Sequence, residues 1–153
     1  MTHLKENEKA PSFEVQDQDS NLVSLSSLSG KKAVLFFYPK DDTPGCTKEA
    51  CSLRDHYDEL RKEGYEVLGI SNDSLKSHNK FISKYRLPYR LLSDPDKTMV
   101  NAFGVYGNKK FMGRAYQGII RTTFVLDEQG MITRIIDKVD TENHAEQILN
   151  LEA

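Results

Sequence analysis

The most apolar segment of the chain is Lys32-Ala33-Val34-Leu35-Phe36-Phe37-Tyr38, and a segment with strong helix signals follows it. The unbroken run of apolar and aromatic residues is typical of a strand that is buried on both faces. Pro44 suits the first position of a helix, and Gly64 suits the position after the last one, so we predict a helix over residues 44–63. A fully buried strand followed by a helix favours an α/β fold.

On both sides of this unit, strand and helix signals alternate along the chain, without repeats or linkers. Short alternating segments flank a polar turn near the start and predict a hairpin, while a second hairpin is expected near the end. The predicted strands cover residues 12–15, 22–25, 32–38, 66–71, 89–92, 121–126 and 131–137. The predicted helices cover residues 44–63, 74–86, 94–103 and a terminal segment capped by Asp140 or Thr141. Residues 105–118, with three glycines, are expected to form a loop.

This order predicts an α/β sandwich with a mixed central sheet, because strand–helix crossovers make parallel pairs and the final hairpin adds antiparallel strands. We expect one domain over residues 1–153, with residues 1–11 as a loose lead-in. A terminal helix carries Ala145, Ile148 and Leu149.

Composition excludes several classes of protein. The formal net charge is −2 and no basic run is interleaved with aromatic residues, which argues against nucleic acid and anionic membranes as partners. The longest apolar run is too short to cross a bilayer. The polar start of the chain has no targeting signal, so we expect a cytoplasmic protein. Thiols stay reduced there, and Cys46 and Cys51 are expected to be catalytic, redox-active or simply buried rather than a structural disulfide.

Cys46 is expected near the third residue of the helix that begins at Pro44, a position that favours a reactive thiolate. Free N–H groups and the helix dipole stabilise an anion at this end, and a thiolate is both an anion and a nucleophile. A helix terminus contributes at most about 2 kcal/mol. Lowering the pKa of an ordinary thiol from about 8.5 to about 6 needs roughly 3.4 kcal/mol. A hydroxyl or cation is therefore expected nearby.

Thr43 is the hydroxyl candidate, and it is also a candidate cap for the helix. Spacing alone does not rank the candidate cations, which are Lys40, Lys48, Arg54 and Arg121.

The spacing of the two cysteines limits what they can do together. Cys51 lies five residues after Cys46, about 140° around the helix axis and about 7.5 Å along it. Their Cα atoms would be roughly 8.6 Å apart, beyond the limit of about 7 Å for a disulfide. If the two cysteines form a bond, the first turns of the helix must unwind. Gly45, Thr47 and Ser52 have low helix propensity and make unwinding easier.

Three further kinds of function are weighed for this pair of cysteines. A dithiol–disulfide oxidoreductase favours Cys-x-x-Cys, whereas four residues intervene here. A soft metal could bind two thiolates and a histidine, but the four histidines show no ligand spacing and are expected to be surface or capping residues. They are His3, His56, His78 and His144. A non-catalytic interaction module has little support from a chain without an exposed apolar run.

At the cysteine segment the sequence resembles the peroxiredoxins, in particular the bacterioferritin-comigratory protein/PrxQ subfamily. The family pattern Pro-x-x-x-Thr-x-x-Cys stands here as Pro39, Thr43 and Cys46, and the resolving cysteine of the subfamily stands as Cys51. Supporting segments are Ala10-Pro11-Ser12-Phe13, Ser93-Asp94-Pro95 and Arg121-Thr122-Thr123-Phe124. The resemblance covers nearly the whole chain.

The resemblance implies a thioredoxin-like three-layer sandwich with an extra N-terminal hairpin, and a thiol peroxidase that needs no metal or organic cofactor. It implies that Cys46 attacks the peroxide and becomes a sulfenic acid, that Cys51 condenses with it to a disulfide, and that thioredoxin or a similar dithiol reduces this disulfide. It also implies a monomer.

The resemblance further implies roles for the neighbouring residues. Thr43, Arg121 and the backbone around Gly45 would hold the peroxide, and among the candidate cations it selects Arg121 as the one that stabilises the thiolate. Pro39 would shield the sulfur from water, and Glu49 would orient the arginine.

Overall fold

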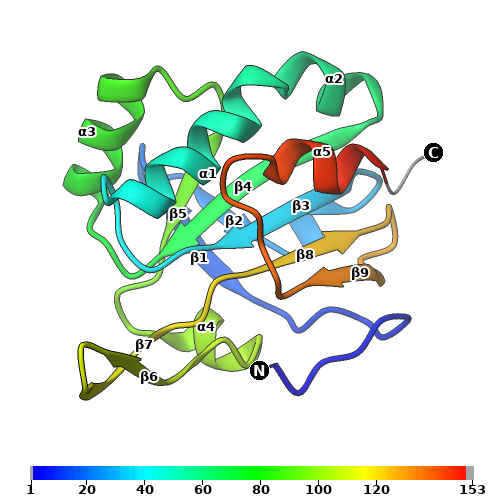
Figure 1. Cartoon of the computed structure of the whole chain (residues 1–153). Coiled ribbons are helices and arrows are strands. Elements are labelled where there is room, and N and C mark those ends of the chain that lie inside the picture. The colour runs from blue at the N-terminus through cyan, green and yellow to red at the C-terminus, as the bar shows by residue number, and fades with distance from the viewer. Residues whose placement is uncertain (1, 151–153) are drawn as a thin grey trace.

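The computed structural model describes residues 2–150, and a seven-stranded mixed sheet with the order β2-β1-β5-β4-β3-β8-β9 forms its centre (Figure 1). The strands of this sheet are β1 (Glu14–Asp17), β2 (Leu22–Ser24), β3 (Lys32–Phe37), β4 (Tyr65–Ser71), β5 (Arg90–Ser93), β8 (Thr122–Leu126) and β9 (Ile132–Ile136). The helices are α1 (Pro44–Asp55), α2 (Tyr57–Lys62), α3 (Leu75–Tyr85), α4 (Thr98–Ala102) and α5 (His144–Leu149), with a short 3-10 turn at Ser26–Leu28.

Strand β3 lies at the centre, as its apolar run predicts. It pairs in parallel with β4 and antiparallel with β8, and no residue from Ala33 to Phe37 is more than 1% exposed. Val34 and Phe36 pack on one side of the sheet, while Leu35 and Phe37 pack on the other. Alternate side chains of one strand therefore serve two separate cores, which confirms the α/β sandwich.

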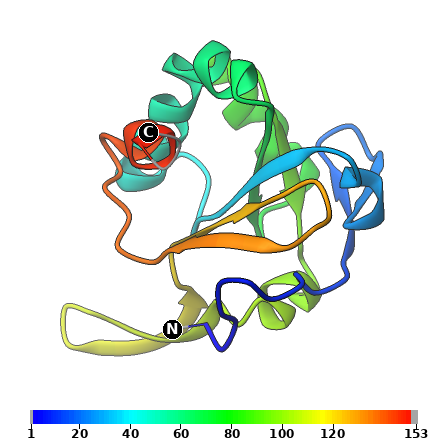
Figure 2. The same cartoon turned by 90° about the vertical axis from the view of Figure 1, so that its right-hand side faces the viewer.

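Helices cover both faces of the sheet, so the molecule has three layers (Figure 2). Buried side chains of α1, α2, α3 and α5 pack against one face. Buried side chains of α4 and the N-terminal segment pack against the other face. No helix within residues 2–150 has the length and apolar character that crossing a membrane requires.

The predicted helix over residues 44–63 is two helices. The chain breaks at His56, whose φ of −112° and ψ of 18° lie outside the helical region, and α2 then continues to Lys62. No proline or glycine lies at this break. Pro44 and Gly64 therefore predict where the helical segment begins and ends, but nothing in the sequence predicts that it divides into two helices. The helix expected from Asp94 begins later, at Thr98, and the Asp94 carboxylate accepts hydrogen bonds from the N–H groups of Met99 and Val100.

The expected loop over residues 105–118 is wrong, because these residues form a second, two-stranded sheet. Strands β6 (Tyr106–Phe111) and β7 (Arg114–Ile119) pair along their whole length and project from the body of the molecule (Figure 1). Most of their side chains are exposed or half-buried, so the sequence has no apolar alternation that would indicate strands.

The start of the chain is also more ordered than the expected loose lead-in. Asn7 donates its N–H to the Ile132 carbonyl at 2.7 Å, and Ile132 donates in return to the Glu8 carbonyl at 2.8 Å. The other expected strands and helices are found within a few residues of their predicted ends. The expected cap of the terminal helix at Asp140 or Thr141 is wrong, because α5 begins at His144 with Asn143 at the N-cap position. The N-terminal hairpin is β1–β2, and Ser74 caps α3, since its side chain accepts from the Ser77 N–H.

Candidate active site

The site is built where β3 ends and α1 begins, at the carboxyl edge of the central strand. Cys46 is the third residue of α1 and only 1% exposed. The first backbone hydrogen bond of α1 joins the Thr47 N–H to the Thr43 carbonyl at 2.8 Å. The N–H groups of Gly45 and Cys46 therefore have no acceptor within the helix and can hold an anionic or oxygen-bearing ligand.

Arg121 is the cation that reaches the cysteine. It precedes β8, whose first residue Thr122 pairs with Phe37 at the end of β3, so the sheet register delivers the arginine to the loop before α1. Its Nη2 lies 3.4 Å from the Cys46 sulfur. The side chain is 23% exposed, which leaves the positive charge poorly screened by solvent.

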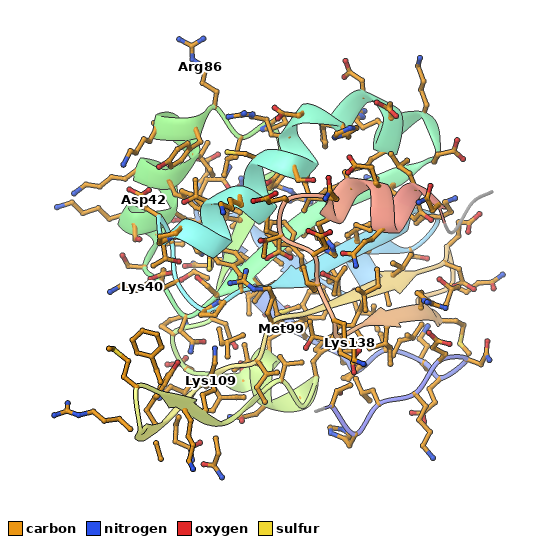
Figure 3. The ribbon with its side chains drawn as sticks, in the orientation of Figure 1. Lys40, Asp42, Arg86, Met99, Lys109 and Lys138 are labelled. Atoms are coloured by element: carbon orange, nitrogen blue, oxygen red, sulfur yellow. The ribbon has the colours of Figure 1, made fainter. Side chains whose placement is uncertain are left out.

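The other candidate cations point elsewhere. Lys48 is paired with Glu142 at 3.2 Å, and Arg54 donates to the Tyr85 carbonyl at 2.8 Å. Lys40 is an exposed side chain in the loop before α1 (Figure 3).

Gly45 leaves the space that Arg121 occupies. A Cβ atom at residue 45 would lie 3.2 Å from Arg121 Nη2, closer than ordinary side-chain contacts. Since the guanidinium passes directly over this backbone, a glycine here allows it to reach the neighbouring sulfur.

Glu49 lies one helical turn after Cys46, on the same side of α1. Its side chain is fully buried, and Oε1 accepts a hydrogen bond from Arg121 Nη1 at 2.6 Å. Burial raises the pKa of Glu49 to about 7, although the charge of Arg121 acts in the opposite direction. The same guanidinium thus contacts the sulfur through one nitrogen and the carboxyl group through the other.

Thr43 occupies the N-cap position of α1 without capping it. Its hydroxyl instead donates to the Lys40 carbonyl at 2.9 Å, and this hydrogen bond lies within the loop before α1. With its proton used in this way, the Thr43 oxygen is left to accept hydrogen bonds. Pro39 is half-buried at the start of this loop.

Cys51 lies further along α1 and is half-buried. Both cysteines are free, and the helix that carries them is continuous from Pro44 to Asp55. Burial raises the pKa of the Cys51 thiol, while the charge of Arg54 acts to lower it. Cys51 is therefore held as a protonated thiol while the helix is folded.

Two buried histidines are corrections to the expectation of surface or capping residues, because His78 and His144 are both fully buried. His78 bonds the Asp41 carboxylate through Nδ1 at 2.8 Å and the Leu92 carbonyl through Nε2 at 2.9 Å. Asp41 also accepts from the hydroxyls of Tyr38 and Ser77. This network fastens the loop before α1 to α3.

The group of Asp41, Asp73 and His78 has atoms close enough to hold a metal ion. Those atoms are already used, since Asp73 Oδ2 accepts from the Asp41 N–H at 2.8 Å and from the Ser71 hydroxyl at 2.7 Å. Internal hydrogen bonds account for the cluster, so it fits a structural network better than a metal site.

Lys109 is a further charged group that sequence reasoning missed. It lies on β6, in the projecting hairpin (Figure 3), and its Nζ donates to the Ile119 carbonyl at 2.7 Å. Partial burial lowers the pKa of Lys109, and the charge of Arg121 lowers it further, while the sulfur of Cys46 raises it. Only folding brings this hairpin to the site.

A cavity of about 680 Å³ lies at the opposite end of β3, and its lining includes Ala33, Leu126 and several serines and lysines. None of the predicted site residues lines it. A large cavity suits a large ligand, whereas the geometry around Cys46 suits a small one.

Comparison with known proteins places the chain in a family. Residues 7–135 match the model of the AhpC/TSA family. The chain is 49% identical over 142 residues to the putative peroxiredoxin bcp of Coxiella burnetii, covering 93% of this chain and 94% of that one. It is 45% identical over 150 residues to peroxiredoxin Bcp of Escherichia coli, covering 98% and 96%.

Solved structures agree with these relatives. A mutant of PrxQ from Xylella fastidiosa superposes with a TM-score of 0.92 at 29% identity, covering 99% of this chain and 97% of that one. Peroxidoxin BcpB from Mycobacterium tuberculosis superposes with a TM-score of 0.85 at 36% identity, covering 97% and 96%. The expected thioredoxin-like fold is confirmed, and the chain belongs to the AhpC/TSA family as a thiol peroxidase of the Bcp/PrxQ type.

Proposed function

We propose that Cys46 is the residue that reduces peroxide and that Cys51 resolves the product. The observation that carries this proposal is the 3.4 Å contact between Arg121 Nη2 and the Cys46 sulfur at the N-terminus of α1. Two sources of positive charge, the helix end and the guanidinium, meet at one sulfur atom. Arg121 is thus the nearby cation that the sequence predicts beside the helix terminus.

In the first step the Cys46 thiolate attacks one oxygen of the peroxide, and the O–O bond breaks. The sulfur gains that oxygen and becomes a sulfenic acid, while the other oxygen takes a proton and leaves as water or an alcohol. Arg121 and the N–H groups of Gly45 and Cys46 stabilise the negative charge that moves between the oxygens. The Thr43 oxygen accepts the hydrogen bond of the protonated oxygen, which aligns the peroxide with the sulfur.

In the second step the Cys51 sulfur attacks the sulfenic acid, and one water leaves as the disulfide forms. The first turns of α1 unwind to bring the two sulfurs together, because the intact helix holds their Cα atoms roughly 8.6 Å apart. Unwinding also exposes Cys51 to water and so removes the burial that holds it protonated. A dithiol reductant of the thioredoxin class then restores both thiols.

We propose hydrogen peroxide and organic hydroperoxides as substrates. A structure of the related Xanthomonas campestris bacterioferritin comigratory protein, 34% identical to this chain, was described in terms of alkyl peroxide reduction, which supports the second class. Cys46 is 1% exposed, so a peroxide must reach it past the half-buried Pro39 and Thr43, which favours small substrates. We place the protein in the cytoplasm as a monomer, where both thiols stay reduced between turnovers.

Two matched variants test these roles. Cys46→Ser should lose all peroxidase activity, whereas Cys51→Ser should complete one turnover and then hold a sulfenic acid on Cys46. Mass spectrometry after dimedone treatment would detect that acid as a single adduct. A Cys46→Ser protein that kept its full rate would contradict the assignment. Turnover with a protein disulfide but not with peroxide would favour a thioredoxin-type oxidoreductase instead.

A further inference from the structure

The projecting hairpin of β6 and β7 gathers hydrophobic side chains at the surface (Figure 1). Within residues 2–150, the large hydrophobic side chains that are exposed are Phe111, Met112 and Tyr116 on this hairpin and Leu22 on β2. Single exposed apolar residues are normal on a protein surface, whereas a group of them on one element marks an interaction site. The hairpin is therefore the part of the described surface best suited to bind a partner.

The register of the hairpin places both aromatic side chains on one face. Lys109 pairs with Tyr116, and Phe111 pairs with Arg114. Directly opposite residues of an antiparallel pair point to the same side, and so do residues two apart along a strand. Lys109, Phe111, Arg114 and Tyr116 therefore share one face, which we call the aromatic face.

The aromatic face is the side of the hairpin that is turned toward the active site. Lys109 Nζ donates to the Ile119 carbonyl at 2.7 Å, two residues before Arg121. Burial and the charge of Arg121 lower the pKa of Lys109, and the sulfur of Cys46 raises it, so both groups lie close to this ammonium. Because Lys109 belongs to the aromatic face, this face and the Cys46 site lie on the same side of the molecule.

Charge on this part of the chain has one sign. No Asp or Glu lies between Asp96 and Asp127, although the chain as a whole has a formal net charge of −2. The basic residues of the same segment are Lys97, Lys109, Lys110, Arg114 and Arg121. A partner that covers the aromatic face must therefore combine apolar contacts with acidic groups.

We propose that the aromatic face is the docking surface for the protein dithiol that reduces the Cys46–Cys51 disulfide, and that apolar and acidic side chains surround this dithiol. The inference rests on the proposed function, because it assumes that the disulfide forms. A standard interface buries about 800 Å² on each partner and is roughly 30 Å across. The six-residue strands of the hairpin extend about 20 Å, so a partner that reaches residues 46–51 also covers the aromatic face.

The docked partner reduces the disulfide by thiol–disulfide exchange. One of its thiolates attacks a sulfur of the disulfide, so that a mixed disulfide forms between the two chains and the other cysteine leaves as a thiolate. The second thiol of the partner then displaces the mixed disulfide. Two electrons and two protons pass to Cys46 and Cys51, and the partner becomes a disulfide. A docking surface beside the site holds the partner through both displacements.

Other occupants of the aromatic face have less support. An anionic membrane would meet a chain whose net charge is itself negative, and the aromatic side chains line the face toward Cys46 rather than the hairpin tip alone. A second copy of the chain is not required by the chemistry, because both cysteines lie on one helix. The reduction step, in contrast, requires a protein or small dithiol at this place.

The test compares two reductants on the same oxidised protein. The disulfide form is mixed either with dithiothreitol, which needs no docking surface, or with pre-reduced thioredoxin of negative net charge. Samples are quenched with an alkylating reagent, and mass spectrometry gives the rate of thiol recovery. In Phe111→Ser, the ratio of the thioredoxin rate constant to the dithiothreitol rate constant should fall roughly tenfold or more, since an aromatic anchor is lost. Leu22→Ser is the matched control, because Leu22 is 63% exposed against 67% for Phe111 but lies on β2.

Charge reversal supplies a second matched pair. Arg114→Glu on the aromatic face should lower the same ratio by a similar factor and weaken its dependence on salt. Lys110→Glu makes the same change of charge on the opposite face of the hairpin, because neighbouring residues of a strand point to opposite sides. We expect a much smaller effect from Lys110→Glu. Equal losses in the two variants would show that only the overall charge matters and would overturn the proposal.

A trapped complex covers the case in which the hairpin variants fail to fold. Thioredoxin whose second active-site cysteine is replaced by serine stays attached to the unmodified chain as a mixed disulfide. Hydrogen exchange followed by mass spectrometry should show slower exchange over residues 106–119 in this complex than in the free oxidised chain, with β1 and β2 as the reference. Unchanged exchange in the hairpin would refute the docking surface.

The outcomes separate this inference from the proposed function. A chain that forms no disulfide with peroxide fails before any reductant is added, and it refutes the proposed function and this inference with it. A disulfide that dithiothreitol reduces and thioredoxin does not would overturn the docking proposal alone, and so would equal losses in Phe111→Ser and Leu22→Ser. Binding to phosphatidylglycerol vesicles, or dimer formation, that Phe111→Ser abolishes while the thioredoxin rate is unchanged would assign the face to a membrane or to a second copy instead.

Discussion

At the scale of single residues, Gly45 controls how closely the Arg121 guanidinium approaches the Cys46 sulfur. A side chain at this position would meet Nη2 at 3.2 Å, on the line between the arginine and the loop. Glu49 holds the opposite side of the same guanidinium at 2.6 Å. The cation is therefore fixed from two sides, and small changes at either side should alter the reactivity of the sulfur.

We expect Gly45→Ala to slow the oxidation of Cys46 by roughly tenfold or more, because a displaced guanidinium loses a charge-assisted hydrogen bond worth about 1.5–3 kcal/mol. Alanine also strengthens the helix by about 1 kcal/mol and so opposes unwinding. The oxidation step must therefore be measured alone, by stopped-flow with one turnover. Gly107→Ala is the control, since its added Cβ would make an ordinary 3.6 Å contact. Equal rates for both variants would contradict the role of Gly45.

Glu49 should also make the free energy of unfolding depend on pH. Its pKa is raised from 4.5 to about 7 in the fold, so the folded state holds a proton that the unfolded state releases between these values. The free energy of unfolding contributed by this group therefore falls as pH rises through that window, by at most about 3 kcal/mol. Urea unfolding of wild type and Glu49→Gln at pH 5 and pH 8 should show a difference that changes with pH. A constant difference would mean that Glu49 is ionised throughout.

At the scale of elements, α1 is the part that must change shape, and the structure shows what holds it. Its first turn has no capping hydrogen bond from Thr43, and the Tyr89 hydroxyl donates to the Ala50 carbonyl at 2.6 Å. Directly after Cys51, the Ser52 hydroxyl accepts from the Ala145 N–H at 3.1 Å, and Arg54 donates to the Tyr85 carbonyl. The first turn thus lacks a cap, the contacts of Arg121 with Glu49 and of Tyr89 with Ala50 hold the second turn, and the C-terminal turn is attached to α5 and to the end of α3.

Oxidation to the disulfide should therefore expose the backbone of residues 44–52 to amide hydrogen exchange. Mass spectrometry of exchanged peptides would compare reduced and oxidised protein, with α3 as an internal reference that keeps its protection. Cys51→Ser treated with peroxide is the matched control, because it carries a sulfenic acid but cannot form the disulfide. Unchanged protection over residues 44–52 in the oxidised wild type would refute the unwinding step.

The elements also show how much of the structure can be predicted from the sequence. The apolar run of β3 predicts its place at the centre, and the cysteine motif predicts which segment carries the chemistry. The β6–β7 hairpin could not be predicted, because its strands are largely exposed and polar and their pairing depends on each other alone. The buried positions of His78 and His144 could not be predicted either, since their partners Asp41 and Glu49 lie 37 and 95 residues away along the chain. Spacing alone likewise left four candidate cations, and the fold of β8 selects one.

At the scale of the whole molecule, the described residues keep both cysteines on one helix of one chain. A disulfide between them needs no second subunit. The exposed apolar side chains of the projecting hairpin, Phe111 and Met112, lie on an element separate from the helix that unwinds. Oxidation and resolution are therefore expected to be complete within a single copy of the protein.

Thiol counting tests this expectation. One equivalent of hydrogen peroxide should remove both free thiols from each chain, and sedimentation should show an unchanged mass. Cys51→Ser should lose one thiol under the same conditions. Covalent dimers in oxidised wild type, visible on a non-reducing gel, would show that resolution occurs between chains.

The attachment of α1 directly after Cys51 also sets the thermodynamics of the cycle. Only the backbone of residues 44–51 gains conformational entropy in the oxidised form, because Ser52 and Arg54 keep the remainder of the helix in place. The heat capacity difference between the two redox forms should then be a small fraction of that for global unfolding. A reductant meets a short, accessible segment on an otherwise intact protein, and rebuilding the helix after reduction needs no refolding of the core.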